Sequence, residues 1–247
     1  MKGTIVPAPR RPVMLSFDDG PRPGTTERVL DALAARGGLD GWPLRAAFFT
    51  LAENPAGWFA RRRLFAPYEV WTDKGSMAAH PELTRQIVAE GHCLGNHGGR
   101  HFWPRWPWFR RGDRVMALLR EWERTVERVV PDMATDVASG DSCGEPIARA
   151  PYLLRTPAWR EAVSRAGYRD VAGITSGDAD PRADGDQVRE TLLARLSRAE
   201  QADSDPARPI VLIFHDTRPL TAECLPAWLE AIEAAGHPLL DFDPSRC

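Results

Sequence analysis

The sequence predicts an α/β fold built on a parallel sheet. Short apolar strands alternate with amphipathic helices along the chain, and the residues that could carry chemistry follow the strands. This pattern fits either a β/α barrel or an open doubly wound sheet. No glycine-rich fingerprint follows the first strand, which disfavours the dinucleotide-binding form of the open sheet. We assign residues 1–247 to a single domain, with its core at 13–242 and a short extension at 1–12.

In the first half of the chain, three strands alternate with three helices. The strands are short apolar runs bounded by turn residues, at 13–15, 45–50 and 92–97. The helices have apolar residues at helical spacing, at 25–36, 81–90 and 113–130. Gly37 closes the first helix, and Pro81 suits the first turn of the second. Residues 51–79 lack a clear period and are predicted to form a long loop.

The second half continues the alternation after a loop rich in Gly, Ser and Asp at about 131–145. Its predicted strands are again short and apolar, at 147–150, 170–174, 210–214 and 238–242. Its helices are predicted at 156–167, 186–200 and 222–235. Thr156 and Pro157 favour the start of one helix, and Gly167 and Gly236 favour the ends of two.

Composition and charge exclude several classes of function. The net charge of −2 gives no reason to expect nucleic-acid binding, and no apolar run is long enough to span a membrane. Residues 1–12 are basic and contain no apolar core, so they are not a signal peptide. We expect a cytoplasmic protein, or an exported one whose signal lies outside this sequence. The four cysteines are widely spread and form no paired metal spacing, so we expect unpaired thiols, with Cys93 in the core.

An acidic pair, Asp18 and Asp19, follows the first strand directly. Two adjacent carboxylates at the mouth of a buried strand repel one another and resist desolvation. A divalent metal ion or an arginine is therefore expected beside them. The alternative interpretation is an ordinary polar turn, Asp-Asp-Gly-Pro, without a chemical role.

Two histidines, His97 and His101, follow the third strand and are spaced four residues apart. This spacing suits a single divalent ion, and together with one carboxylate the set leaves positions open for water and substrate. Taken alone, the two residues could also be solvated loop histidines. A further histidine, His215, ends the apolar run at 210–214 and is expected at the same face of the sheet.

Five segments of the chain resemble, in order, the five motifs of the polysaccharide deacetylases, also known as the NodB homology or carbohydrate esterase 4 family. They read SFDDGP, NHGGRH, RAPY, SGDAD and LIFHD, and the resemblance covers nearly the whole chain from about residue 13 to 216 and beyond. The ordered set is far more specific than any one motif. It implies a distorted (β/α)7 barrel, similar to a TIM barrel. It also implies metal-dependent removal of N- or O-linked acetyl groups from a carbohydrate.

The resemblance also implies a role for each matching residue. One divalent metal ion would bind to Asp19, His97 and His101, with Zn²⁺ favoured and Co²⁺, Ni²⁺ and Mn²⁺ as alternatives. Asp18 would be the general base that removes a proton from water, and Arg149 would orient it.

Three further residues would assist the reaction in a member of this family. The backbone N–H of Tyr152 would stabilise the oxyanion. His215 would protonate the leaving group, and an Asp of the fourth motif would keep it cationic. We favour Asp178 over Asp180 for this second role, because Asp180 precedes a proline and fits a turn.

The chain departs from the family pattern at four positions. Gly98 stands where Ser or Thr is usual. Phe102 occupies the position after the second histidine, where the family often has Pro. Ala179 replaces a tryptophan, and Ile213 stands near the usual leucine. In the family the last two positions help to form the acetyl pocket, so we expect Ile213 to contact substrate and the pocket to differ in shape.

An aromatic segment follows the second histidine, and its Trp103 and Trp106 are candidates for stacking on sugar rings. The alternative is that these rings only pack the rim of the barrel. The expected partner of the chain is thus an acetylated saccharide. Two other functions stay open: hydrolysis of a small non-carbohydrate amide, and carbohydrate binding without catalysis. The intact acidic and histidine residues argue against the second.

Overall fold

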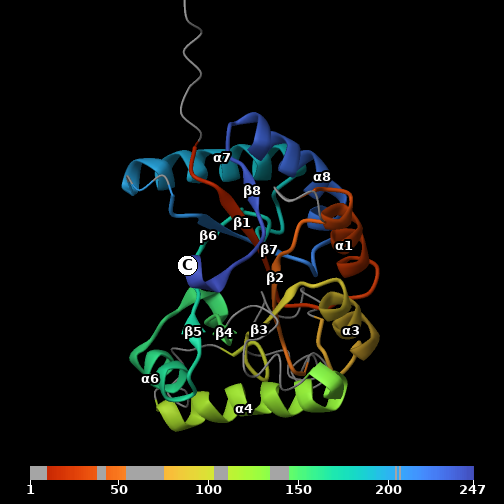
Figure 1. Ribbon diagram of the computed structural model, residues 1–247, viewed down its shortest axis with the longest axis vertical. Helices are drawn as coiled ribbons and strands as arrows, with labels where there is room; N and C mark the ends of the chain where they lie inside the picture. Colours follow the sequence, from red (N-terminus) through yellow and green to blue (C-terminus); the bar gives the residue numbers. More distant parts are fainter. Residues whose placement is uncertain are drawn as a thin grey trace, which may run out of the picture.

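The computed structural model describes residues 10–37, 43–53, 75–102, 111–133, 145–203, 205 and 207–247. Within them, parallel strands form a curled sheet with helices on its outside (Figure 1). The strands are β1 (Val13–Asp18), β2 (Ala47–Thr50), β3 (Cys93–Asn96), β4 (Ile147–Ala148), β5 (Arg169–Asp170), β6 (Ile174–Thr175), β7 (Ile210–His215) and β8 (Leu239–Leu240).

The sheet has the strand order β5-β4-β3-β2-β1-β7-β6, and every pairing between these strands is parallel. Strand β1 lies at its centre and pairs with β7 along its whole length. On the other side of β1, β2 pairs with the second half from Ser16 to Asp18, and β8 pairs with Val13 and Met14. The strand that opens the sequence is therefore the one on which the sheet is built.

The predicted strand at 170–174 is wrong in one respect, because the structure divides it into β5 and β6. Strand β5 pairs with β4 at one edge of the sheet, and β6 pairs with β7 at the other. Between them the chain passes so close to β7 that a Cβ atom at Gly173 would lie 2.8 Å from the carbonyl oxygen of Val211. One short segment thus joins both edges and curls the sheet into a half-barrel. This confirms the predicted fold class, a distorted β/α barrel.

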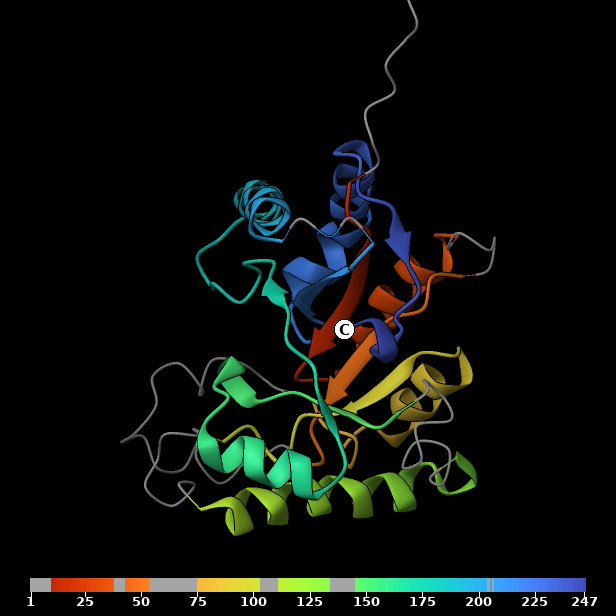
Figure 2. The same cartoon turned by 60° about the vertical axis from the view of Figure 1, so that its left-hand side comes forward.

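In the described part of the chain, six α-helices cover the outside of the sheet: α1 (Thr26–Ala34), α3 (Pro81–Ala89), α4 (Gly112–Val129), α6 (Pro157–Arg165), α7 (Gly185–Ala202) and α8 (Pro219–Ala234). They follow one another around it, with contacts from α7 through α8, α1 and α3 to α4 and α6 (Figure 1). Figure 2 shows α6 alongside α4. Short 3₁₀ helices lie at Pro131–Met133, Pro151–Leu153 and Pro244–Arg246. None of the helices in these ranges is long and apolar enough to cross a membrane.

Local sequence signals explain where several helices begin. Thr156 accepts a hydrogen bond from the N–H of Trp159, and Asp184 forms a capping box with Gln187. The last long helix begins at Pro219 rather than at the predicted residue 222, since proline fits the first turn of a helix.

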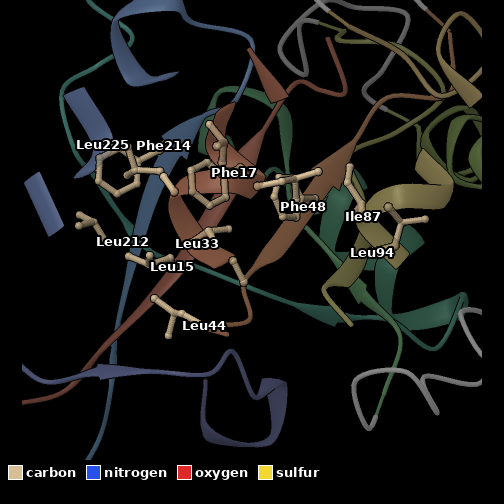
Figure 3. Packing of buried hydrophobic residues seen from close by; sticks show 14 of the residues in the cluster. Leu15, Phe17, Leu33, Leu44, Phe48, Ile87, Leu94, Leu212, Phe214 and Leu225 are labelled. Carbon is tan, nitrogen blue, oxygen red and sulfur yellow. The ribbon is translucent and has the colours of Figure 1, made fainter. Parts of the chain in front are cut away.

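The core lies between the strands and the helices, where alternate residues of each strand point outward. Phe17 of β1 stacks on Phe48 and Phe214, with ring centroids 5.0 and 5.9 Å apart, and Leu33 of α1 and Leu225 of α8 belong to the same cluster (Figure 3). Each such side chain stabilises the fold by about 1.5–3 kcal/mol when fully buried. This outward packing fixes the register of the strands, and therefore the direction of the polar residues at their ends.

Candidate active site and metal centre

The candidate site lies where the parallel strands end. Asp18 is the last residue of β1 and His215 the last of β7, and these two are register partners in the sheet. His97 directly follows β3, and Arg149 directly follows β4. The carboxyl ends of parallel strands meet at one face of a barrel, so residues far apart in sequence come together there.

Asp19, His97 and His101 form a group that could hold a metal ion. The Oδ1 atom of Asp19 lies 3.5 Å from Nε2 of His97 and 3.4 Å from Nε2 of His101. One ligand atom from each residue lies within 4.8 Å of the other two. Two imidazole nitrogens and one carboxylate oxygen suit a divalent transition metal, and three protein ligands leave positions for water and substrate. The residues therefore fit the expected metal.

The backbone prepares both His97 and Asp19 for this role. His97 donates a hydrogen bond from Nδ1 to the carbonyl oxygen of Arg149 at 2.9 Å, so that in the neutral ring the lone pair lies on Nε2, the atom 3.5 Å from Asp19. Asp19 has a φ of +78°, a left-handed conformation that aspartate adopts more readily than most residues. Its N–H donates to the carbonyl oxygen of Phe49 at 3.1 Å, which holds this turn against β2.

Asp18 interacts with a different partner, the buried guanidinium of Arg149. Nη1 of Arg149 lies 2.7 Å from Oδ1 of Asp18 and 2.9 Å from the hydroxyl of Ser16. The guanidinium also lies over the ring of Phe49, 3.9 Å from its centroid. Both members of the pair are almost fully buried. Arg149 thus orients Asp18 and compensates its charge.

Replacing Arg149 by Met is expected to lower the free energy of unfolding by about 3–5 kcal/mol, because it leaves the Asp18 carboxylate buried without its counter-charge. Denaturant unfolding measures this loss. Arg165→Met is the matched control, since Arg165 forms an exposed pair with Glu161 and its loss should change stability by no more than about 0.5 kcal/mol. Equal effects of the two substitutions would contradict the account of the buried pair.

His215 forms a second charged pair, with Asp178. Its Nδ1 donates to Oδ1 of Asp178 at 2.9 Å, and its backbone N–H donates to Oδ2 at 2.7 Å. Asp178 is fully buried and also accepts hydrogen bonds from the hydroxyls of Ser176 and Thr221. The His215 side chain keeps 18% of its surface exposed, so a substrate can reach it.

Pairing raises the pKa of His215 above its ordinary value and holds the pKa of Asp178 below its own. Burial on its own would lower the pKa of His215, but the Asp178 carboxylate and its hydrogen bond, helped by Asp19 and Asp18, raise it to about 9. Burial would raise the pKa of Asp178, but the charge and hydrogen bonds of His215 hold it below its ordinary value. Asp180 instead accepts a hydrogen bond from the N–H of Arg182 in an exposed turn. The structure therefore brings Asp178, not Asp180, to His215.

Replacing Asp178 by Asn should shift the basic limb of the pH–rate profile to lower pH. If cationic His215 is the proton donor, turnover falls as the pH rises through the pKa of His215, and loss of the carboxylate lowers that pKa. The profiles of the wild type and of Asp180→Asn, measured under saturating substrate, should coincide. An unchanged limb in Asp178→Asn would mean that His215 is not the acid, and a shift in Asp180→Asn alone would transfer the role to Asp180.

Tyr152 lies beside the metal group, in a short 3₁₀ turn after β4. Its ring meets that of His101 edge-on, with centroids 4.3 Å apart, and 39% of the residue is exposed. Its φ of +56° is unusual for an aromatic residue and marks a tightly held turn.

Of the residues expected to contact substrate, the structure describes Ile213, which lies on β7. It is 1% exposed, so its side chain is almost fully buried. Trp103 and Trp106 lie outside the described residues.

Sequence reasoning missed several residues that support the site. Asn96, the last residue of β3, accepts a hydrogen bond from the N–H of Gly98 and donates to the carbonyl oxygen of Leu119 and the hydroxyl of Tyr168. It thereby shapes the turn that carries both histidines. Gly98 has a φ of +93°, which explains why glycine occupies this position. No local pattern predicts the contacts of Asn96 with Leu119 and Tyr168, since these partners are distant in the sequence.

Comparisons with known proteins agree with this geometry. The family model for polysaccharide deacetylase matches residues 6–171. A chitooligosaccharide deacetylase from Rhizobium leguminosarum bv. trifolii is 32% identical over 214 residues, which cover 85% of this chain and 73% of that protein.

Two solved structures share the fold. The chitin deacetylase of the fungal pathogen Colletotrichum lindemuthianum matches with a TM-score of 0.63 and 19% identity, over 95% of this chain and 86% of its own. A family 4 acetyl xylan esterase from Clostridium thermocellum, in complex with a cobalt ion, matches with a TM-score of 0.59 and 19% identity, over 95% of both chains.

The matched part of the family model exceeds half of the chain and includes Asp18, Asp19, His97, His101 and Arg149. The resemblance inferred from the five segments is thereby confirmed. The chain belongs to the polysaccharide deacetylase family and is a hydrolase of the deacetylase type.

Proposed function

We propose that the chain is a metal-dependent hydrolase that removes acetyl groups from an N-acetylated saccharide. The observation that carries this proposal is the meeting of three groups at one face of the barrel: the pair Asp18–Arg149, the set of Asp19 with two histidines, and the pair His215–Asp178. Similarity to a chitooligosaccharide deacetylase supports an amide on a sugar as the substrate.

Each group has a separate task in the proposed reaction. A divalent ion held by Asp19, His97 and His101 would polarise the acetyl carbonyl and acidify a water molecule. Asp18, held by Arg149, takes the proton from the attacking water.

The other residues act on the oxygen and on the leaving group. The backbone N–H of Tyr152 donates to the carbonyl oxygen as negative charge develops on it. Cationic His215 then gives its Nε2 proton to the leaving nitrogen, because its Nδ1 proton is engaged by Asp178. The proposed acid and base are thus separate groups: His215 is paired with a carboxylate, and Asp18 is paired with a guanidinium.

We propose Zn²⁺ as the ion, since a site of two imidazoles and one carboxylate with open positions is typical of catalytic zinc. Co²⁺, Ni²⁺ and Mn²⁺ are alternatives that the same donor atoms accept. Elemental analysis of the purified protein, followed by activity after exchange with each ion, identifies the metal.

Acetate release from a panel of substrates tests the function. The panel contains a chitooligosaccharide as the N-acetyl substrate, an acetylated xylan as the O-acetyl substrate and a small acetamide without a sugar. Each is incubated with the wild type, with the wild type plus chelator, and with Asp18→Asn as the blank. We expect chelator-sensitive release from the chitooligosaccharide. Faster release from the small acetamide would favour an amide hydrolase of another kind, and binding of the oligosaccharide without release from any substrate would favour a non-catalytic binding protein.

A further inference from the structure

We propose that Asp216, acting through Thr26, is a positioning residue that holds the turn after β1 and thereby sets the metal affinity of the site. The inference rests on the proposed metal site at Asp19, His97 and His101, and it concerns a residue to which the reaction gives no task. Asp216 directly follows β7, and its side chain reaches α1 on the outer side of the sheet.

Asp216 is a buried acid that accepts a short hydrogen bond from Thr26. It has no exposed surface, and its Oδ2 accepts a hydrogen bond at 2.6 Å from the hydroxyl of Thr26, which is also fully buried. Its Oδ1 has no hydrogen-bond partner within the described ranges. Burial raises the pKa of Asp216 to about 7, opposed by the Thr26 hydrogen bond and helped by the charge of Asp19. Burial of a carboxyl group is energetically unfavourable, so we expect Asp216 to have a structural role in the residues around it.

The surroundings of Asp216 are the turn that carries the acidic pair. A Cβ atom at Gly20, the residue after Asp19, would overlap the Asp216 carboxylate, so the carboxylate packs directly against this backbone. The Thr26 hydroxyl that donates to Asp216 also accepts a hydrogen bond from the N–H of Arg22 at 2.8 Å. Asp216 thus contacts the turn directly at Gly20 and indirectly, through Thr26, at Arg22.

The opposite side of the same turn is fixed to β2. The N–H of Asp19 donates to the carbonyl oxygen of Phe49, and the N–H of Leu51 donates to that of Gly20 at 3.2 Å. The turn is therefore clamped between the end of β2 and the end of β7. Because Asp216 has no exposed surface, its carboxylate is closed to substrate, and its role in the proposal is to position Asp19.

Metal affinity should respond to the loss of this clamp. Asp19 supplies the only carboxylate of the group, and its Oδ1 lies 3.4–3.5 Å from the two histidine nitrogens. Residues that orient metal ligands typically account for about 10–100-fold in affinity or activity. A turn released at Gly20 and Arg22 lets the Asp19 carboxylate move relative to the histidines, which sit on a separate loop.

The test measures the Zn²⁺ affinity of metal-free protein by competition with a chromogenic chelator. We expect Asp216→Ala to weaken binding by about 10–100-fold, and Thr26→Val to weaken it less. The loss in the double variant should be smaller than the sum of the two single losses, since both substitutions remove the hydrogen bond between Thr26 and Asp216. Asp216→Asn should keep most of the wild-type affinity, because its amide oxygen can still accept the proton of the Thr26 hydroxyl. Thr84→Val is the matched control, a fully buried helical threonine on α3 whose hydroxyl donates a hydrogen bond to the carbonyl oxygen of His80, within its own helix turn.

Wild-type affinity in both Asp216→Ala and Thr26→Val would overturn the inference. An equal loss in Thr84→Val would also overturn it, because the effect would then be general loosening of the fold. If Asp216→Ala does not fold, the comparison of Thr26→Val with Thr84→Val decides. A wild-type protein that binds no Zn²⁺ or other divalent ion would instead contradict the proposed metal site, which separates the two failures.

Discussion

Replacing Asp18 by Asn should lower kcat by about 10²–10⁴-fold, the usual loss when a positioned general base is removed. The amide cannot take a proton from water, but it can still accept the hydrogen bond from Arg149 at the place of the carboxylate. The substitution should leave metal binding unchanged, because the carboxylate at the metal group belongs to Asp19. Acetate release at saturating substrate, combined with elemental analysis, measures both properties.

The neighbouring variant Asp19→Asn is the matched control for this result. It changes the same functional group one residue along the chain, and it should lose metal affinity first and activity as a consequence. Added metal ion should therefore restore part of its activity but none of that of Asp18→Asn. If the two variants exchanged these phenotypes, the roles of the acidic pair would be reversed.

Replacing His97 or His101 by Ala should remove the bound metal and abolish acetate release while the barrel stays folded. The described residues offer one group of three ligands, so loss of one imidazole leaves two. We expect affinity to fall by more than about 100-fold, beyond the usual effect of a residue that only orients a ligand. His80→Ala is a control, since that histidine is partly exposed on the loop before α3.

Circular dichroism establishes that each variant is folded, and elemental analysis gives the metal content. A full equivalent of metal retained by the double variant His97→Ala, His101→Ala would show that the ion binds elsewhere. Activity retained without metal would show that the ion is not required. Either result would remove the basis of the proposed reaction.

Much of the site could be predicted because its residues follow strands whose apolar patterns are clear. The run before Asp18 and the run before His215 are both fully buried strands, and their shared direction places both residues at one face. The choice of Asp178 over Asp180 also depended on local chemistry, because a proline after Asp180 favours a turn.

Other features could not be predicted because they depend on contacts between distant parts of the chain. Strands β5 and β6 lie in one continuous segment, and only their different partners, β4 and β7, divide them. Thr221 supports Asp178 from a helix that begins after β7, and Thr26 supports Asp216 from the first helix. Both donors are threonines, a residue type common on protein surfaces, and no sequence motif distinguishes these two from other threonines.

We propose that one divalent ion, bound by Asp19, His97 and His101, works together with Asp18 to release acetate from a saccharide. Titrating chelator-stripped protein with Zn²⁺ tests it most directly, with acetate release from a chitooligosaccharide as the readout. We expect no activity in the stripped protein, a linear rise with added ion and a plateau at one equivalent. Full activity in the stripped protein, or an equal rise in His97→Ala, would contradict it.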